Sequence, residues 1–452
     1  MLDNLTNFID EFGKHKADYC DLYLQSSAAH SVRYEDMKFS EFSSVVTEGC
    51  GARIISRGKS FYAHRPGVSL DSVSSSFGSA LEAACIGSSV NFCGKEKLFE
   101  ANSSLKRAEV DFFHDIDSNL RSRSDKIKQV SIAMAQTDKN VLIIAPHGLV
   151  RQGKRSYTTF MVQIVAEKNG QLQTASERKY LAVDIDGFLN KTDFMQLANT
   201  AFERAMLMLD AKPCPAGVMN VYLAGEAGGT IIHEACGHGL EADIIEKDAS
   251  VFKGKIGSRV ACDLVTMVDD PTMSDLYGSY TFDDEGTDAK RTVLIEDGIL
   301  KGYMTDRLTS MLYGYPMTGN GRRQSYKKIP IPRMSNTFLL PKGAKSEQEM
   351  LDLAGDGLYV KKMGGGEVNP TTGDFVFYVS EAYIIKGGKK AQAVKGATLT
   401  GNGPEVLQNI IALGDNLVMD AGVCGKSGQS VPVTDGQPSM LIKNMTVGGS
   451  IA

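Results

Sequence analysis

The stretch Gly228–Glu246 reads GGTIIHEACGHGLEADIIE and places His233, Glu234 and His238 within six residues of one another. Imidazoles bind zinc and similar metals through a neutral ring nitrogen, and an adjacent carboxylate can take a proton from metal-bound water. The familiar metalloprotease spacing is His-Glu-x-x-His, in which both histidines lie on one helix face. Two histidines flanking a glutamate therefore favour a metal site over a purely structural helix.

The spacing of this pair sets a geometric requirement, because the second histidine comes five residues after the first. In an ideal α-helix, five steps of about 100° leave the two rings roughly 140° apart. Both rings can reach one ion only if the helix bulges, tightens or ends between them. We expect Gly237 to permit such a break, since glycine tolerates unusual backbone conformations.

A metal held by two histidines needs a third protein ligand if the fourth position is to remain open for water. Glu241 is the local alternative, three residues beyond His238 on the same helix. Cys424 is the distant one, in a glycine-flanked turn where a thiolate could approach an ion. Spacing alone leaves both alternatives open.

The length and composition are those of an ordinary globular protein. The chain has 452 residues, which is long enough for two or three domains. Its net charge of −5 argues against direct binding to nucleic acid. The N-terminus lacks a signal pattern, and no apolar run approaches the roughly 20 residues that span a bilayer. Eight cysteines are spread without paired spacing. We therefore expect a cytoplasmic protein that does not bind membranes.

The order of the expected elements predicts an α+β fold. Residues 19–63 read as several short strands with turn signals at Gly49, Gly51 and Arg57-Gly58. Helical spacing covers 70–86, 110–128 and 194–209, and further hairpin signals stand at 168–170 and 297–298. Strands mixed with separate helices, without βα alternation, indicate α+β architecture.

Two prolines at residues 211–215 mark the best linker. We therefore expect an N-terminal α+β domain over residues 1–212. A mainly antiparallel β domain, which carries the metal-site helix, follows over residues 213–452.

Other motifs in the chain are weaker indications of function. Gly58-Lys59-Ser60 and Gly425-Lys426-Ser427 lack the upstream glycine of a phosphate-binding P-loop, so both are expected to be turns. The loop GNGRR, residues 319–323, joins a flexible backbone to two guanidiniums, which suits a carboxylate or carbonyl ligand. We expect Arg322, Arg323 and Tyr280 to bind a peptide or stabilise an oxyanion.

Five blocks, HEACGHGLEAD, GSYTFDDEG, TGNGRR, PRMSNT and GVCGKSGQSVPV, occur in this order and resemble the TldD/PmbA family, once called modulators of DNA gyrase. The resemblance extends over essentially the whole chain. It implies one zinc ion per catalytic subunit, held by His233, His238 and Cys424, with Glu234 as the general base. It also decides against Glu241 as a ligand. The His-Glu-x-x-x-His element is intact, so the chain looks like the catalytic TldD type.

The resemblance implies a two-subunit peptidase whose substrates are flexible peptides and unfolded small proteins. We therefore expect a zinc-dependent endopeptidase, working as a homodimer or as a heterodimer with a non-catalytic PmbA (TldE-type) sister. One alternative is a non-enzymatic regulatory protein with a structural metal or none, and another is a hydrolase of non-peptide substrates. Glu234 argues against a structural site, because such a site needs no base.

Overall fold

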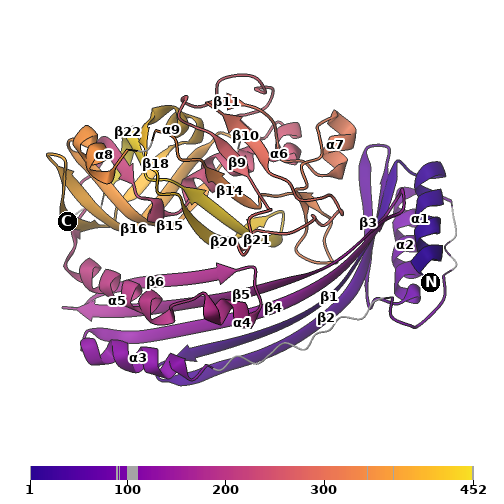
Figure 1. Cartoon of the computed structure of the whole chain (residues 1–452), viewed down its shortest axis with the longest axis horizontal. Helices are drawn as coiled ribbons and strands as arrows, with labels where there is room; N and C mark the ends of the chain where they lie inside the picture. Colours follow the sequence, from indigo (N-terminus) through magenta and orange to yellow (C-terminus); the bar gives the residue numbers. More distant parts are fainter. Residues whose placement is uncertain are drawn as a thin grey trace.

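The first part of the chain forms one antiparallel sheet of six strands in the order β3-β2-β1-β4-β5-β6. The computed structural model describes residues 2–87, 90, 92–98, 110–343, 345–369 and 371–449. Figure 1 shows that β1, β2, β4 and β5 are long and run through most of the length of the molecule. Their bounds are β1 (Tyr19–Glu35), β2 (Lys38–Ser56), β3 (Lys59–Pro66), β4 (Ile127–Ala145), β5 (Leu149–Lys168) and β6 (Gln171–Leu181).

The strands of this sheet are longer than the sequence predicts, and two expected turns are wrong. Gly49 and Gly51 lie inside β2, which pairs without interruption with β1 across both positions. A Cβ at Gly49 would overlap the ring of Tyr326, and one at Gly51 would overlap the hydroxyl of Tyr62. These glycines therefore make room for aromatic side chains that pack on the strand.

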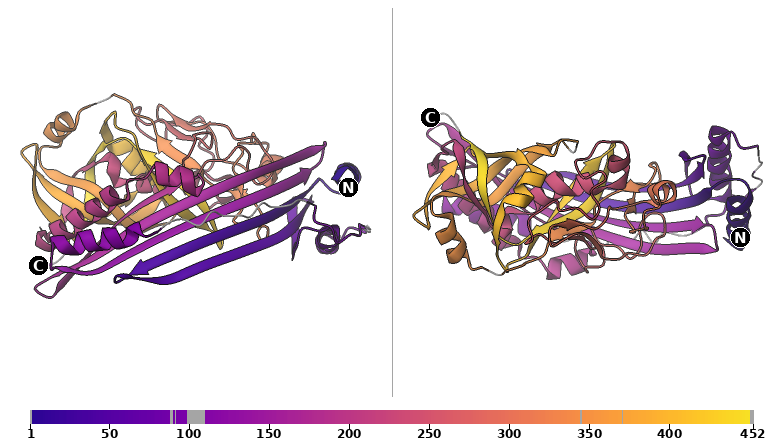
Figure 2. Two further views of the ribbon diagram at one scale, coloured as in Figure 1. Left: turned by 60° about the horizontal axis from the view of Figure 1, so that its bottom comes forward. Right: turned by 90° about the horizontal axis from the view of Figure 1, so that it is seen from above.

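Five helices cover the two ends of this sheet. At one end α1 (Leu2–His15) and α2 (Leu70–Ala84) enclose a core with β1 and β2. At the other end α3 (Phe112–Arg123), α4 (Ile185–Asn190) and α5 (Phe194–Asp210) pack against β4 and β5. Figure 2 shows that the end bearing α1 and α2 projects beyond the rest of the molecule. We call the sheet and these helices the first lobe.

The second lobe begins where β7 (Lys212–Pro213), in the expected linker, pairs with β17. Its larger sheet closes on itself, because β15 pairs with both β8 and β16. The strands of the ring enclose the largest core, into which α9 (Gly403–Asn409) also packs. Their bounds are β8 (Gly217–Leu223), β15 (Gly357–Val368), β16 (Asp374–Lys386), β18 (Thr398–Asn402) and β22 (Met440–Gly448), with β17 (Lys389–Lys395) and β19 (Ile410–Leu413) beside it.

A second sheet of this lobe, in the order β11-β10-β9-β14-β21-β20, stands against the helical segment that begins near residue 230. Its edge strand β20 faces β6 of the first lobe (Figure 1). The bounds are β9 (Met267–Asp269), β10 (Thr292–Glu296), β11 (Ile299–Leu300), β14 (Asn336–Leu339), β20 (Val418–Lys426) and β21 (Gln429–Gln437). A short hairpin and two helices complete the lobe: β12 (Gly321–Arg322), β13 (Ile331–Pro332), α7 (Arg307–Tyr313) and α8 (Glu347–Ala354).

The α+β fold and both predicted hairpin turns are confirmed. Asn169 and Gly170 join β5 to β6, and Asp297 and Gly298 join β10 to β11, all four with positive φ. Among the described residues, no helix has the length and apolar character needed to cross a membrane.

Buried ion pairs fasten the two lobes together. Arg53 on β2 bonds Asp21 of the same sheet and, at 2.6 Å, Glu285 of the second lobe. Arg155 on β5 donates to Asp284 at 2.7 Å. The first two acidic groups and Arg53 are fully buried, so these contacts fix the position of one lobe against the other.

Candidate metal centre

The segment carrying the two histidines departs from α-helical geometry, as the five-residue spacing requires. Residues Ile232–Gly237 form one π-helical turn, in which the N–H of His238 donates to the carbonyl of His233. A turn closed by an i→i+5 bond brings residues five apart onto the same face. A 3₁₀ turn over His238–Leu240 and helix α6 (Ala242–Glu246) follow. The predicted distortion between the histidines is confirmed.

Gly237 has a different role from the one expected. Its φ of −57° and ψ of −52° are ordinary right-handed helical values, so its conformational freedom is not used. A Cβ at this position would instead overlap the sulfur of Met334. The glycine allows the turn to pack closely against Met334, which lies just before β14 of the second sheet.

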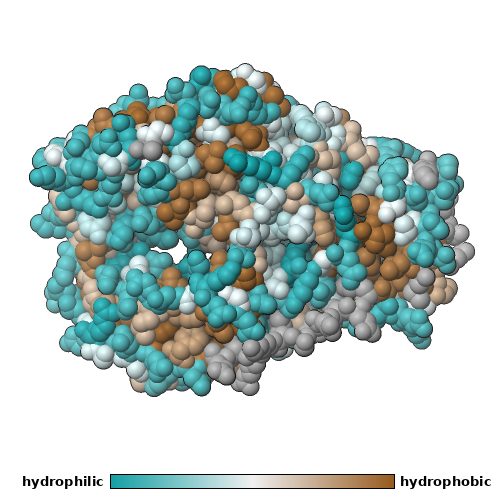
Figure 3. All heavy atoms as spheres, in the orientation of Figure 1, coloured by the Kyte–Doolittle hydropathy of each residue, from teal (hydrophilic) through white to brown (hydrophobic). Residues whose placement is uncertain are grey.

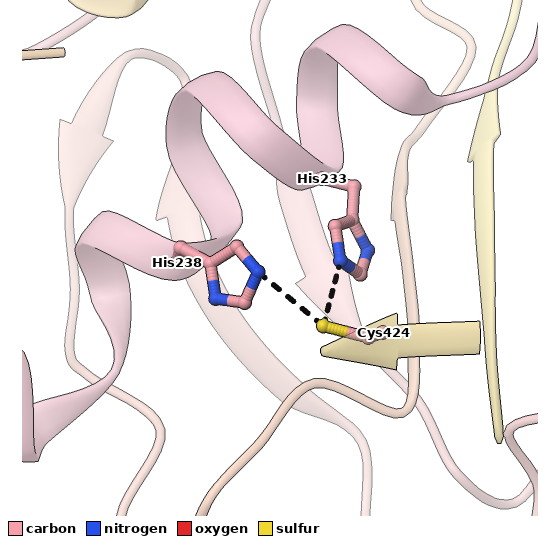
Figure 4. A group of neighbouring side chains, drawn as sticks. All are labelled: His233, His238 and Cys424. Carbon is pink, nitrogen blue, oxygen red and sulfur yellow. Dashed lines mark hydrogen bonds between the residues drawn. The ribbon is translucent and has the colours of Figure 1, made fainter. Parts of the chain in front are cut away.

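Cys424 brings the sulfur of a distant strand against both imidazoles (Figure 4). Its Sγ lies 3.2 Å from Nε2 of His233 and 3.3 Å from Nε2 of His238. All three side chains are buried, with exposures of 4, 8 and 5% for His233, His238 and Cys424. The three donor atoms lie within 4.8 Å of one another. Two imidazole nitrogens and one sulfur are a donor set that suits zinc.

Glu241, the alternative ligand, lies on the far side of His238. Its Oε2 is 2.9 Å from Nδ1 of that ring and 2.9 Å from Nζ of Lys426. A carboxylate only accepts, so Nδ1 donates the proton and Nε2 is left to face the sulfur. This arrangement resembles the carboxylate–histidine pairs that orient metal ligands elsewhere.

The surrounding charges favour the thiolate. Burial alone raises the pKa of the Cys424 thiol, but His233 and His238 outweigh it and lower the pKa to about 4. Burial also raises the pKa of Glu241, while Lys426 and His238 reverse the effect and bring it to about 2. The sulfur is thus prepared to donate as an anion, the form in which cysteine binds metals.

Glu234 lies at the edge of the donor set and faces open space. Its Oε2 is 3.9 Å from Nε2 of His238, and 31% of its side chain is exposed. Together with His233 it lines a cavity of about 430 Å³ between the lobes, here called the metal-side cavity. Residues of β6, β15 and β20 form its walls, and Figure 3 shows a hollow at this place.

Sequence reasoning missed several charged residues around the site. Asp420 on β20 accepts from Arg178 of the first lobe at 3.3 Å and from Lys362 at 3.2 Å, beside the metal-side cavity. The sequence holds a signal for Asp420 in its spacing from Cys424 and Lys426. Residues an even number apart on one strand share a face, and these three are spaced in that way.

Arg322, Arg323 and Tyr280 do not line the metal-side cavity. Arg322 donates to the carbonyl of Met334 at 2.5 Å, and Tyr280 donates to that of Gly319 at 2.8 Å. Arg323 bonds the carbonyl of Asp284 at 3.1 Å. All three are buried, and these positions do not support the expected role beside the scissile bond.

Three family models match successive parts of the chain. They are the PmbA/TldA metallopeptidase domain 1 over residues 20–85, the central domain over 103–209 and the C-terminal domain over 216–449. A "Metalloprotease TldD homolog" of Haemophilus influenzae is 36% identical, with 99% of this chain and 96% of that protein aligned. This chain belongs to the TldD/PmbA family.

Two further comparisons, one of sequence and one of structure, concern other TldD- and TldE-type proteins. A "Zinc metalloprotease TldD homolog" of Saccharolobus solfataricus is 29% identical over 76% of each chain. The crystal structure of TldE from Thermococcus kodakarensis has the same fold, with a TM-score of 0.77 and 19% identity, covering 99% of this chain and all of that one.

Proposed function

We propose that this chain is a zinc-dependent endopeptidase that hydrolyses flexible or unfolded peptides and small proteins. The observation that carries the proposal is the arrangement of His233, His238 and Cys424 beside Glu234, at the wall of a cavity between two lobes. The names of the metalloprotease relatives support the same class of activity.

The residues at the centre divide into metal ligands, a base and an orienting carboxylate. His233, His238 and Cys424 would hold the zinc ion, which when bound supplies a Lewis acid that polarises a carbonyl and acidifies water. Glu234 takes a proton from the attacking water and passes it to the leaving amine. Glu241 keeps the ring of His238 in the required tautomer through its bond to Nδ1.

The shape of the metal-side cavity favours a flexible substrate. The donor residues are buried, and Glu234 lines a cavity whose walls come from β6 of the first lobe and from β15 and β20 of the second. A folded protein could not bring a peptide bond into this space, whereas a single extended segment could.

Fold similarity and cysteine chemistry support a proposal for the working assembly and its location. We propose a homodimer or a heterodimer with a TldE-type partner, supported by the fold shared with the Thermococcus kodakarensis TldE. All eight cysteines are free thiols, which suits a reducing compartment such as the cytoplasm.

Replacing Glu234 by Gln tests the proposed base. The variant should keep its zinc but hydrolyse an unstructured, fluorescently quenched peptide at least about 10²-fold more slowly, the loss typical of a missing general base. Glu226→Gln is the matched control, because Glu226 is exposed and does not line the cavity. Near-normal turnover by Glu234→Gln would remove the role assigned to Glu234.

A regulatory protein with a structural metal is the second candidate. It is favoured by the burial of the donor set, in which no side chain is more than 8% exposed. In that case zinc removal would lower the melting temperature, while the zinc-loaded protein would cleave none of a panel of unstructured peptides. Zinc-dependent cleavage that is lost in Glu234→Gln would exclude it.

A further inference from the structure

A second cavity, of about 190 Å³, lies between the lobes, and four of its twelve lining residues are basic. We call it the basic cavity. Lys139 and Arg155 come from the sheet of the first lobe, and Arg322 and Arg323 come from the second. Asp284 is the only carboxylate among its lining residues. The cavity is distinct from the metal-side cavity, although Pro432 lines one and the next residue, Val433, lines the other.

The strand register forces two of these cations together. Lys139 on β4 is directly opposite Arg155 on β5, and it is also opposite Ser27 on β1. Like charges at directly opposed positions of an antiparallel pair are destabilising. The placement of Lys139 opposite Arg155 is therefore unfavourable as long as no anion is bound between them.

The available counter-charges do not balance the four cations. Asp284 is shared, since it accepts from the Arg155 side chain at 2.7 Å and from the backbone N–H of Arg323 at 2.8 Å. Arg323 is also 3.7 Å from Asp21, but that carboxylate already bonds Arg53.

Lys139 and Arg322 make no ion pair with any described carboxylate. The Nζ of Lys139 donates to the carbonyl of Gln324 at 3.3 Å and lies 5.9 Å from the centre of the Tyr23 ring. Arg322 donates to the carbonyl of Met334 and lies 5.0 Å from the centre of the Tyr280 ring. Its Nε is buried without a partner, as is that of Arg323.

Burying charge without a partner is costly, and an arginine cannot relieve the cost by losing its proton. A lysine can, and burial together with the nearby arginines lowers the pKa of Lys139 to about 8. Arg322, only 2% exposed, keeps its charge. An anion in the cavity would neutralise this excess.

We propose that the basic cavity binds a small oxyanion and thereby links the two lobes. Ser27, Thr137 and Tyr157 also line it, and hydroxyl side chains can act as neutral donors beside the four cations. Guanidinium groups are well suited to phosphate and carboxylate oxygens. Two sources share this chemistry, free inorganic phosphate and the C-terminal carboxylate of a peptide, and the volume admits either group but no nucleotide.

Calorimetric titration of the full-length, zinc-loaded chain with sodium phosphate, at constant ionic strength, tests the site. We expect saturable binding and a rise in melting temperature. Lys139→Met should weaken phosphate binding at least about tenfold, because a charge-assisted contact is lost. Lys154→Met is the matched control, since Lys154 precedes Arg155 on β5 but is half-exposed and pairs with Asp138.

We expect Lys139→Met to fold, because the substitution removes an uncompensated buried charge. A loss of phosphate binding can therefore be assigned to the site. Its melting temperature in phosphate-free buffer should equal or exceed that of the wild type. Thr137→Val is the milder second variant, which should weaken phosphate binding a few-fold.

A second titration distinguishes the two sources. It uses an unstructured peptide with a free C-terminal carboxylate and the same peptide as an amide, in the Glu234→Gln background to prevent cleavage. Binding of the free acid but not the amide, weakened by Lys139→Met, would support the site and identify a carboxylate ligand. Absence of saturable binding of both phosphate and the free acid, or equal binding by Lys139→Met and Lys154→Met, would overturn it.

Discussion

The Nδ1 atom of His238 lies 2.9 Å from Oε2 of Glu241, and Nζ of Lys426 lies 2.9 Å from the same oxygen. Lys426 follows Cys424 by two residues on β20. One carboxylate therefore connects the helical turn that supplies two donors with the strand that supplies the third.

Glu241→Gln should weaken zinc binding by about 10–100-fold, because loss of the charge that orients a ligating histidine has an effect of this size. Competition with a chromogenic chelator measures the affinity directly. Glu246→Gln, whose carboxylate bonds Tyr315 at 2.6 Å away from the donors, should bind zinc as the wild type does. Equal affinities for the two variants would contradict a role for Glu241.

Gly229→Ala should disturb the start of the π turn. Its carbonyl accepts from the N–H of His233 at 2.8 Å, and a Cβ would overlap the backbone of Gly436 and Asp435 on β21. Because backbone atoms cannot move aside easily, we expect a loss of about 1–3 kcal/mol in stability and weaker zinc binding. Gly302→Ala is the control, since a Cβ there meets open space. Urea denaturation of both variants supplies the comparison.

Arg53→Met should destabilise the junction of the lobes. Its removal leaves Asp21 and Glu285 as buried carboxylates without their cation, and breaking such a pair costs about 3–5 kcal/mol. Lys386→Met removes a pair with Asp356 that is exposed on both sides, so its unfolding midpoint should not change. The prediction fails if the two variants unfold at the same urea concentration.

Asp306→Asn should remove part of the pH dependence of stability. Burial, reinforced by Glu285, raises the pKa of Asp306 to about 7. A raised acid pKa favours the folded state while the group is protonated, so this contribution is lost as the pH rises toward 7. Asparagine keeps the cap of α7, where the side chain accepts from Thr309.

The comparison uses the difference in the free energy of unfolding between the wild type and Asp306→Asn. In this difference the contributions of the other titrating groups cancel. The wild type should lose about 1–3 kcal/mol relative to the variant between pH 5 and pH 8. Urea midpoints at pH 5, 6, 7 and 8 provide the measurement. A difference that is constant with pH would show that Asp306 titrates at its ordinary value.

Local features of the fold could be predicted from the sequence. The apolar spacing of residues 194–209 gave a helix that extends over Phe194–Asp210, and the Asn169-Gly170 pair gave a hairpin turn. Both depend on interactions within a few residues. The length of β2 could not be predicted, because Gly49 and Gly51 look like turn residues until Tyr326 and Tyr62 arrive from elsewhere in the chain.

The same distinction applies to the candidate site. The distortion between His233 and His238 follows from their spacing alone, and the structure contains it. Sequence spacing could not decide between Glu241 and Cys424 as the third metal ligand, because only the tertiary fold brings β20 against the two histidines. Arg322 and Arg323 were expected near substrate from their charge, but the register of the lobes places them in the basic cavity.

The third donor is far from the other two along the chain, since Cys424 comes 191 residues after His233. A ribosome adding about 5–20 residues per second needs ~10–40 s to cover that interval. During translation the histidines therefore emerge long before the sulfur, and the nascent polypeptide cannot assemble the triad until β20 and β21 have been made. The hydrolase proposed above would therefore have no activity toward unfolded chains nearby on the polysome until that point of its own synthesis.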